Sequence, residues 1–384
     1  MIVAGRGGSA VGIGPRLTLG LDMGATRIIL AGTFPWERSH GSAESHEGNR
    51  DQAVHVGLVG TGRIGALHAR SLRASPLVSR LTVVDVDQDQ AAGVARALGA
   101  DQMESPQALL AARPDAVVIA AATPAHAELL HMAADASVAA FCEKPIALDL
   151  AATDGVIDHV NRSGIFVQIG FQRRFDAGYQ AARHAVQSGA LGDVHMVRLA
   201  THDPAPPPDA YLAASGGIWR DLAIHDFDIA AWVVSRPVIE VFADGVAHEP
   251  LFARHDDVDA ACALLRFEGD ILGVVSAGRN DARGYDVRME VFGLGDSVAV
   301  GWDERTALRS LEPGFEAPAR PGYTSFLERF EPAYRAELLA FLAALKDGAE
   351  SPCPVTDARQ ALAVALAADR SCREHRPVRV EEVG

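Results

Sequence analysis

The stretch that decides the fold runs from Val54 to Gly65 and reads VHVGLVGTGRIG. Its first half is apolar and rich in valine, which predicts a short buried strand over residues 54–59. The second half reads G-x-G-x-x-G, and residues 63–74 after it have the pattern of a helix. Strand, glycine turn and helix in this order predict a dinucleotide-binding site, with the pyrophosphate at the helix N-terminus.

Each part of this motif has a physical task. Gly60 permits the tight turn, Gly62 lets the backbone approach a phosphate, and Gly65 lets the helix pack closely on the strand. Asp85 ends the next predicted strand, at the separation from Gly65 expected for a carboxylate that accepts from the ribose hydroxyls. Asp87 is the alternative ribose acceptor, or else a solvated turn acid. The Asp85 carboxylate would repel a 2′-phosphate, so the expected cofactor is NAD rather than NADP.

The composition of the 384-residue chain is that of a globular protein, with 48% hydrophobic and 22% charged residues. Its formal net charge of −15 argues against nucleic acid or an anionic membrane surface as the main partner. The four cysteines form no C-x-x-C pair, which fits a reducing cytoplasm. No apolar run reaches the roughly 18 residues that a membrane span needs. We therefore expect a cytoplasmic protein whose partner is a small molecule.

Strands and helices alternate as far as about residue 174, which predicts a doubly wound parallel sheet with helices on both faces. The expected strands are 54–59, 81–85, 116–121, 138–142 and 165–170. The expected helices are 63–74, 88–98, 105–112, 125–135 and 150–162. Residues 54–174 are thus predicted to form an NAD-binding Rossmann domain, after a poorly ordered N-terminal extension over 1–53.

After Gln172 the pattern changes to short strands joined by tight turns, which predicts an antiparallel sheet. The expected strands are 194–200, 238–247, 259–267, 271–278, 286–293 and 297–300. The expected helices are 176–188, 218–234, 331–347 and 356–374, and proline-rich 311–321 is expected to be a loop. Residues 175–384 are therefore predicted to form an α+β domain for substrate binding and oligomerisation.

Two predicted strands of the first domain end in unusual polar residues. Glu143-Lys144-Pro145 directly follows an apolar strand, at the edge of the sheet where this fold class binds its ligands. Lys144 is either a solvated surface charge or a group aimed at a substrate, and the fixed turn around it favours the second interpretation. His126 and the Thr123-Pro124 turn follow the preceding strand and are expected at the same edge.

A second cluster lies on the predicted helix over 218–234. Asp221 and His225 are four positions apart, so on a helix their side chains face the same way. Apolar neighbours indicate a buried helix, in which acids and histidines are usually paired. The alternatives are a structural Asp–His pair or a helix cap. A metal site built from His225, Asp226 and Asp228 is rejected, because its ligands would point around different faces of the helix.

Five motifs in this order resemble the glucose–fructose oxidoreductase / inositol dehydrogenase (Gfo/Idh/MocA) family over about residues 54–380. The motifs are Gly60-x-Gly62-x-x-Gly65, Thr123-Pro124-x-His126, Glu143-Lys144-Pro145, GFQRRFD over 170–176, and Asp221-x-x-x-His225-Asp226-x-Asp228. The Arg173-Arg174 pair and His202-Asp203-Pro204 make the chain more similar to the inositol 2-dehydrogenase branch. The resemblance implies a Rossmann domain, a second domain with an open, mostly antiparallel sheet, and a homotetramer built on that sheet.

The resemblance also implies roles for individual residues. It assigns Lys144, Asp221 and His225 as the catalytic set, which also contacts substrate. Further substrate contacts would come from Arg173, His202 and Tyr285. The expected cofactor contacts are Gly60, Gly62, Arg63, Ile64, Gly65, Asp85, Thr123, Pro124, His126, Glu143 and Lys144.

Elementary chemistry agrees with these roles. Oxidation of an alcohol needs a base, and His225 has a suitable pKa at neutral pH. Lys144 would stabilise the developing alkoxide, and Asp221 would orient His225. We therefore expect NAD-dependent oxidation of a ring hydroxyl of myo-inositol, or of a related cyclitol or sugar, to a ketone. The alternatives are an aldose or other sugar dehydrogenase of the same family, and a nucleotide-sensing binding protein without turnover.

Overall fold

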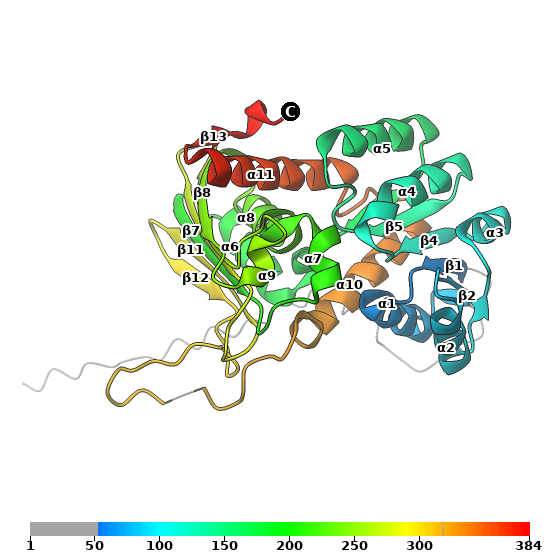
Figure 1. The fold of residues 1–384 in the computed structure, drawn as a ribbon, viewed down its shortest axis with the longest axis horizontal. Coiled ribbons are helices and arrows are strands. Elements are labelled where there is room, and N and C mark those ends of the chain that lie inside the picture. The colour runs from blue at the N-terminus through cyan, green and yellow to red at the C-terminus, as the bar shows by residue number, and fades with distance from the viewer. Residues whose placement is uncertain (1–52, 317) are drawn as a thin grey trace, which may run out of the picture. The chain divides into compact units, whose positions relative to one another are not determined.

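A six-stranded parallel sheet forms the first part of this computed structural model, which describes residues 53–316 and 318–384 (Figure 1). The strand order is β3-β2-β1-β4-β5-β6, so the chain reverses its direction of winding between β1 and β4. In sheets of this kind the ligand lies beyond the carboxyl ends of the strands at that reversal. The strands are β1 Val54–Val59, β2 Val78–Val84, β3 Asp101–Gln102, β4 Ala116–Ile119, β5 Ala139–Glu143 and β6 Val167–Gly170.

Helices cover both faces of this sheet, as expected for a Rossmann fold. They are α1 Arg63–Ala74, α2 Gln88–Leu98, α3 Pro106–Ala111, α4 His126–Asp135 and α5 Leu150–Ser163. The buried side chains of α3, α4 and α5 pack on one face, and those of α1 and α2 pack on the other with the later helix α10. The doubly wound α/β fold is therefore confirmed, whereas the predicted extension over residues 1–53 lies almost wholly outside the described residues.

The second sheet has seven strands in the order β12-β11-β7-β10-β9-β8-β13. Strands β7 and β10 pair in parallel, and every other neighbouring pair is antiparallel. The expectation of a mostly antiparallel sheet is confirmed. The strands are β7 Val194–His202, β8 Val238–Val246, β9 Ala260–Phe267, β10 Leu272–Gly278, β11 Asp286–Gly293, β12 Ser297–Val300 and β13 Val378–Arg379.

One face of the second sheet packs against helices α6, α8 and α11, which lie beside it in Figure 1. Two helices beyond those predicted appear in this part of the chain, α7 and α9. The helices are α6 Ala177–Gln187, α7 Asp209–Ser215, α8 Ile224–Val234, α9 Pro250–Ala253, α10 Phe326–Asp347 and α11 Val355–Glu374. Short 3-10 turns occur at Thr123–Ala125, Gln172–Phe175 and Val380–Glu382.

One predicted helix start is wrong, and one predicted helix is not regular along its whole length. The helix expected over 331–347 begins at Phe326, because Ser325 caps it and the helix continues through Pro332. The helix expected over 218–234 is present, but Trp219–Ala223 form a π-helical turn ahead of α8. In such a turn the hydrogen bonds run from residue i to i+5, so side chains four positions apart lose their usual alignment. No helix in the described parts of the chain is long and apolar enough to cross a membrane.

Candidate active site

The glycine turn between β1 and α1 is shaped by close backbone contacts. Gly60 has a φ of +95°, in a region that only glycine adopts readily. A Cβ atom on Gly65 would lie 1.9 Å from the carbonyl oxygen of Gly60, so helix and turn would have to separate. A Cβ on Gly62 would meet nothing within 4 Å. The turn is therefore closed on its protein side and open at Gly62, which leaves room for a ligand.

Asp85 lies just beyond the end of β2 and faces the glycine turn. Its carboxylate accepts from the backbone N–H and the hydroxyl of Thr61, at 2.5 and 2.8 Å, and from the backbone N–H of Asp87 at 2.9 Å. Burial raises the pKa of Asp85, but the hydrogen bonds from Thr61 and Asp87 outweigh it and lower that pKa. Asp85 is thus held as an anion beside the glycine turn. Asp87 itself caps α2.

The turns that follow β4 and β5 lie at the same edge of the sheet. Pro124 is exposed and Thr123 half-buried in the turn after β4, whereas His126 is 1% exposed. The two ring nitrogens of His126 lie 2.8 Å from the carbonyl oxygen of Pro145 and 2.9 Å from that of Ala121. His126 therefore ties the two turns together, and both of its nitrogens face protein rather than a ligand.

Lys144 follows β5 and reaches across to the π-helical turn. Its ammonium nitrogen donates to the backbone carbonyl oxygen of Asp221 at 2.7 Å and lies 3.4 Å from the Asp221 carboxylate. Both side chains are only slightly exposed, at 13% for Lys144 and 11% for Asp221. A buried charge requires a partner, so each side chain fixes the position of the other.

Two residues that the sequence analysis did not identify, Tyr211 and Arg279, complete the surroundings of Asp221. Tyr211 of α7 donates to one carboxylate oxygen at 2.8 Å, and Arg279, just after β10, donates to the other at 2.8 Å. Arg279 also donates to Asp203 at 2.9 Å, and it is 3% exposed. Burial raises the pKa of Asp221, but the charges of Lys144 and Arg279 outweigh it and lower that pKa to about 2.

His225 lies in the first turn of α8, and no hydrogen bond joins it to Asp221. Its Nδ1 is buried and has no hydrogen-bond partner among the described residues, and its ring packs edge-on against Phe171 at 5.9 Å. The expected Asp221–His225 pair is not formed, because the π-helical turn directs Asp221 towards Lys144 and Arg279. Burial, assisted by the charges of Lys144 and Arg173, lowers the pKa of His225 well below its ordinary value.

The two arginines of the GFQRRFD motif pair with the two acids that follow His225. Arg173 donates to Asp226 at 2.6 Å and to the hydroxyl of Thr201 at 2.9 Å. Arg174 donates to Asp228 at 2.9 Å, and all four charged side chains are nearly or fully buried. The Arg-Arg and Asp-x-Asp motifs are thus halves of one buried structure that anchors α8 beneath the site.

Residues predicted to contact substrate lie on two faces of the second sheet. Successive side chains of a strand point to opposite faces. Thr201 of β7 faces the helices and bonds to Asp226, so His202 faces the other way, where its Nε2 lies 2.8 Å from the Ser276 hydroxyl. Tyr285 is buried on the helix side of the sheet, and its ring packs edge-on against that of Phe330. The chain therefore brings Tyr285 and Arg173 to one face, and His202 to the opposite one.

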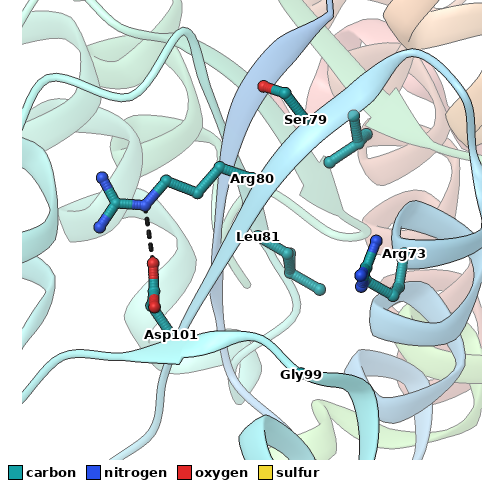
Figure 2. A pocket seen from close by; sticks show the side chains of 7 residues that line it. Arg73, Ser79, Arg80, Leu81, Gly99 and Asp101 are labelled. Carbon is teal, nitrogen blue, oxygen red and sulfur yellow. Dashed lines mark hydrogen bonds and ion pairs between the residues drawn. The ribbon is translucent and has the colours of Figure 1, made fainter.

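Two hollows in the described structure lie away from Lys144 and His225. The first, of about 90 Å³, is at the amino end of β2, where Arg80 and Asp101 form an exposed ion pair at 2.7 Å (Figure 2). This end of the sheet is opposite to the glycine turn. The second, of about 700 Å³, lies over strands β8 to β10 and includes His202 and Ser276 in its lining. Neither hollow holds the predicted catalytic set.

The fold and the site define a class of protein. A glycine turn between a parallel strand and a helix, an anionic carboxylate beside it and an anchored lysine near a buried histidine are typical of a nucleotide-dependent oxidoreductase. Residues 54–171 match the model of the oxidoreductase family with an NAD-binding Rossmann fold, and residues 179–298 match the GFO/IDH/MocA C-terminal domain. The chain belongs to the GFO/IDH/MocA oxidoreductase family.

The chain aligns with nearly the whole length of the relatives described next. A myo-inositol 2-dehydrogenase from Thermotoga maritima is 36% identical, over 86% of this chain and 99% of the relative. The myo-inositol dehydrogenase Hyg17 from Streptomyces leeuwenhoekii is 39% identical, over 82% and 96%. A crystal structure of scyllo-inositol dehydrogenase from Lactobacillus casei, with bound NAD(H) and scyllo-inositol, matches with a TM-score of 0.77 and 27% identity, over 86% and 99%.

Proposed function

We propose that the protein is an NAD-dependent dehydrogenase that oxidises a ring hydroxyl of myo-inositol, or of a closely related cyclitol, to a ketone. The observation that carries the proposal is the anchoring of Lys144 by Asp221, beside His225, in a chain similar to myo-inositol dehydrogenases along nearly their whole length. An anchored lysine next to a neutral imidazole suits the removal of a proton from an alcohol.

The cofactor is proposed to bind at the glycine turn. Residues 54–174 would form the NAD-binding domain, with the pyrophosphate at the start of α1 and the ribose at Asp85. When bound there, NAD supplies the acceptor for the hydride. The open space at Gly62 and the anionic Asp85 fit such a ligand. Arg63 and Ile64, at the first turn of α1, and the Thr123-Pro124 turn would complete the contacts.

Residues 175–384 would form the substrate-binding domain, and Lys144 and Arg173 would reach the site from the first domain. The proposed roles follow from charge and burial. His225 accepts the hydroxyl proton, because the low pKa of its buried ring keeps it neutral and ready to act as a base. Lys144 holds the substrate oxygen and stabilises the negative charge that grows on it. Asp221 orients Lys144 rather than His225. Tyr285 and Arg173, on the same side of the sheet, line the space for the polyol ring.

The direct test is NAD reduction by the purified protein over a panel of myo-inositol, scyllo-inositol, other cyclitols, glucose and other aldoses. We expect the highest kcat/KM with a cyclitol, and a kcat roughly 10²- to 10³-fold lower with the Lys144→Met variant on that cyclitol. A clear preference for an aldose would replace the cyclitol with a sugar. NAD binding without reduction by any member of the panel would favour a nucleotide-sensing protein instead.

We further propose that the protein assembles as a homotetramer through the second sheet. The sheet face opposite the helices exposes apolar side chains, namely Phe242, Val246, Leu264 and Leu272, and exposed apolar patches of this kind are typical of subunit contacts. Light scattering after gel filtration measures the mass. A monomer that is fully active would refute this assembly. The cellular location is a separate proposal. The four cysteines of the protein are free, which supports a reducing cytoplasm.

A further inference from the structure

Three ionisable side chains meet in the interior of the protein, near the end of β5, the strand that Lys144 follows. They are His68 of α1, Glu143 at the end of β5 and Glu337 of α10. Their nearest nitrogen and oxygen atoms all lie within 4.8 Å of one another. His68 and Glu337 are 0% exposed, and the Glu143 side chain is 12% exposed. We call these three residues the buried cluster.

One hydrogen bond joins the members of the buried cluster. Nε2 of His68 lies 2.7 Å from a carboxylate oxygen of Glu143. Nδ1 of His68 and both carboxylate oxygens of Glu337 have no hydrogen-bond partner among the described residues. The cation next in sequence, Lys144, is directed away to Asp221. Two ionised carboxylates would therefore share a buried space with no lysine or arginine paired to them among the described residues, which is an unfavourable state for buried charges.

The two carboxylates differ in their surroundings. Glu143 accepts from His68 and reaches solvent to a small extent, and both features stabilise an anion. Room for its carboxylate exists because residue 170 is glycine, where a Cβ would lie 3.1 Å from Glu143 Oε2. Glu337 has neither feature. One negative charge is thus expected in the cluster, and it belongs on Glu143.

We propose that Glu337 is a neutral carboxylic acid at neutral pH, that Glu143 carries the single negative charge of the buried cluster, and that this charge state positions Lys144 for the reaction. The effect on Lys144 rests on the proposed function of that residue. The charge states of Glu337 and Glu143 concern the folded chain alone and do not depend on its activity.

The groups that face Glu337 support this assignment. They are His68 from α1, Glu143 from β5, the buried Cys353 thiol and the Tyr334 ring, one turn earlier on α10, which packs edge-on against His68 at 5.9 Å. Burial and the charge of Glu143 raise the pKa of Glu337 well above its ordinary value. Ionisation of Glu337 would add repulsion against Glu143, the residue directly before Lys144. The protonated state of Glu337 therefore protects the geometry of that strand end.

A metal ion is the competing way to neutralise two carboxylates, since histidine and glutamate are metal ligands. The structure favours the proton, because His68 Nε2 and the Glu143 oxygen are already in hydrogen-bond contact at 2.7 Å. A metal between these atoms would have to break that contact and push them apart, whereas a proton on Glu337 needs no additional space.

The decisive comparison uses two isosteric amide variants and one control. Glu337→Gln imitates the neutral acid, so we expect kcat and KM within about twofold of the unmodified protein. Glu143→Gln removes the charge that accepts from His68, so we expect a loss in kcat of about tenfold or more, the usual effect of losing a charged hydrogen-bond acceptor. Glu331→Gln, on an exposed position of the same helix, is the matched control. The reverse pattern, with Glu143→Gln tolerated and Glu337→Gln impaired, would overturn the proposal.

Two measurements are independent of turnover. Infrared spectra at neutral pH should show the carbonyl band of a protonated carboxylic acid, absent in Glu337→Gln and retained in Glu331→Gln. Since the pKa of Glu337 is raised above the 4.5 of an unfolded glutamate, the folded state binds the extra proton and loses stability as pH rises above that value. As the pH is raised from acid to neutral, the melting temperature of Glu337→Gln should therefore rise relative to that of the unmodified protein.

Other outcomes of these measurements would contradict parts of the proposal. No such infrared band, together with a pH-independent difference in melting temperature, would show that Glu337 is ionised. Elemental analysis that finds a stoichiometric transition metal, lost in Glu337→Gln, would replace the proton with a metal site. If the band and the melting curves behave as expected but Glu143→Gln keeps full kcat, the charge assignment stands and only the link to Lys144 fails.

Discussion

The ammonium nitrogen of Lys144 lies 2.7 Å from the backbone carbonyl oxygen of Asp221, a residue 77 positions later in the chain. This contact joins the end of a parallel strand to the π-helical turn of the second half of the protein. The position of Lys144 thus depends on the backbone of the turn as well as on its carboxylate. Asp221 and Lys144 are thus held against each other, and His225 follows in the first turn of α8.

The first prediction concerns Lys144 itself. Lys144→Met keeps the apolar stem but removes the charge that would stabilise the alkoxide, so kcat should fall by roughly 10²- to 10³-fold, the range for one lost oxyanion donor. NAD affinity, measured by fluorescence titration, should change little in comparison. An unchanged kcat would show that Lys144 is only a structural partner of Asp221.

Energetic coupling should follow the observed contacts. Asp221→Asn and Lys144→Met should be strongly non-additive in kcat/KM, because the two side chains touch and act as a unit. Asp221→Asn with His225→Ala should be closer to additive, since no hydrogen bond joins them. Two double-mutant cycles under one set of conditions make the comparison. Stronger coupling between Asp221 and His225 would restore the catalytic-triad arrangement expected from their spacing.

Arg279 should govern the ionisation of Asp221. Arg279→Gln removes a buried positive charge 2.8 Å from the carboxylate, so the pKa of Asp221 should rise from about 2 towards the ordinary value for aspartate. A carboxylate with a lowered pKa adds stability that is lost as pH falls, so the variant should lose that stability at a higher pH than the unmodified protein. Acid unfolding curves of both proteins measure the shift. Arg283→Gln, on a neighbouring residue outside this network, is a control.

Much of this architecture was accessible from the sequence. The strand at residues 54–59, the helix at 63–74 and the acid at Asp85 are linked by local rules, because the turn, the helix start and the strand end each need particular residue types. The order of strands and helices then determines the fold class. Lys144 was recognisable because a charged residue directly after an apolar strand is unusual.

Long-range partners were not accessible in the same way. Arg279 follows β10 just as Lys144 follows β5, but only the folded chain shows that it meets Asp221. The π-helical turn has no local sequence signal, so the assumption of regular helical spacing placed Asp221 beside His225. The expected strand over 194–200 stops short of His202, so only the folded chain shows that Thr201 and His202 both belong to β7 and face opposite sides of it.

Cofactor choice provides a prediction for the first half of the chain. Asp85→Ala should lower kcat/KM for NAD by about 10- to 100-fold, the range for one lost hydrogen bond to a charged group, and should raise the relative use of NADP. Because Asp85 also holds Thr61, the melting temperature must be measured in parallel. Asp87→Asn, which alters only the cap of α2, serves as the control. A wild-type preference for NADP would refute the role of Asp85.

The last prediction is the pH dependence of His225. His225→Ala should lower kcat by roughly 10²- to 10⁴-fold, the range for a lost general base, with NAD affinity preserved. In the unmodified protein kcat/KM should rise with pH and level off, and the midpoint should lie below the 6.5 of an ordinary histidine, because burial and the charges of Lys144 and Arg173 lower the pKa of His225. Lys144→Met removes one of those charges, so the midpoint of its residual activity should move to higher pH. A midpoint that is the same in both proteins would assign the titration to another group, and a His225→Ala variant with full kcat would make Lys144 the first candidate for the base.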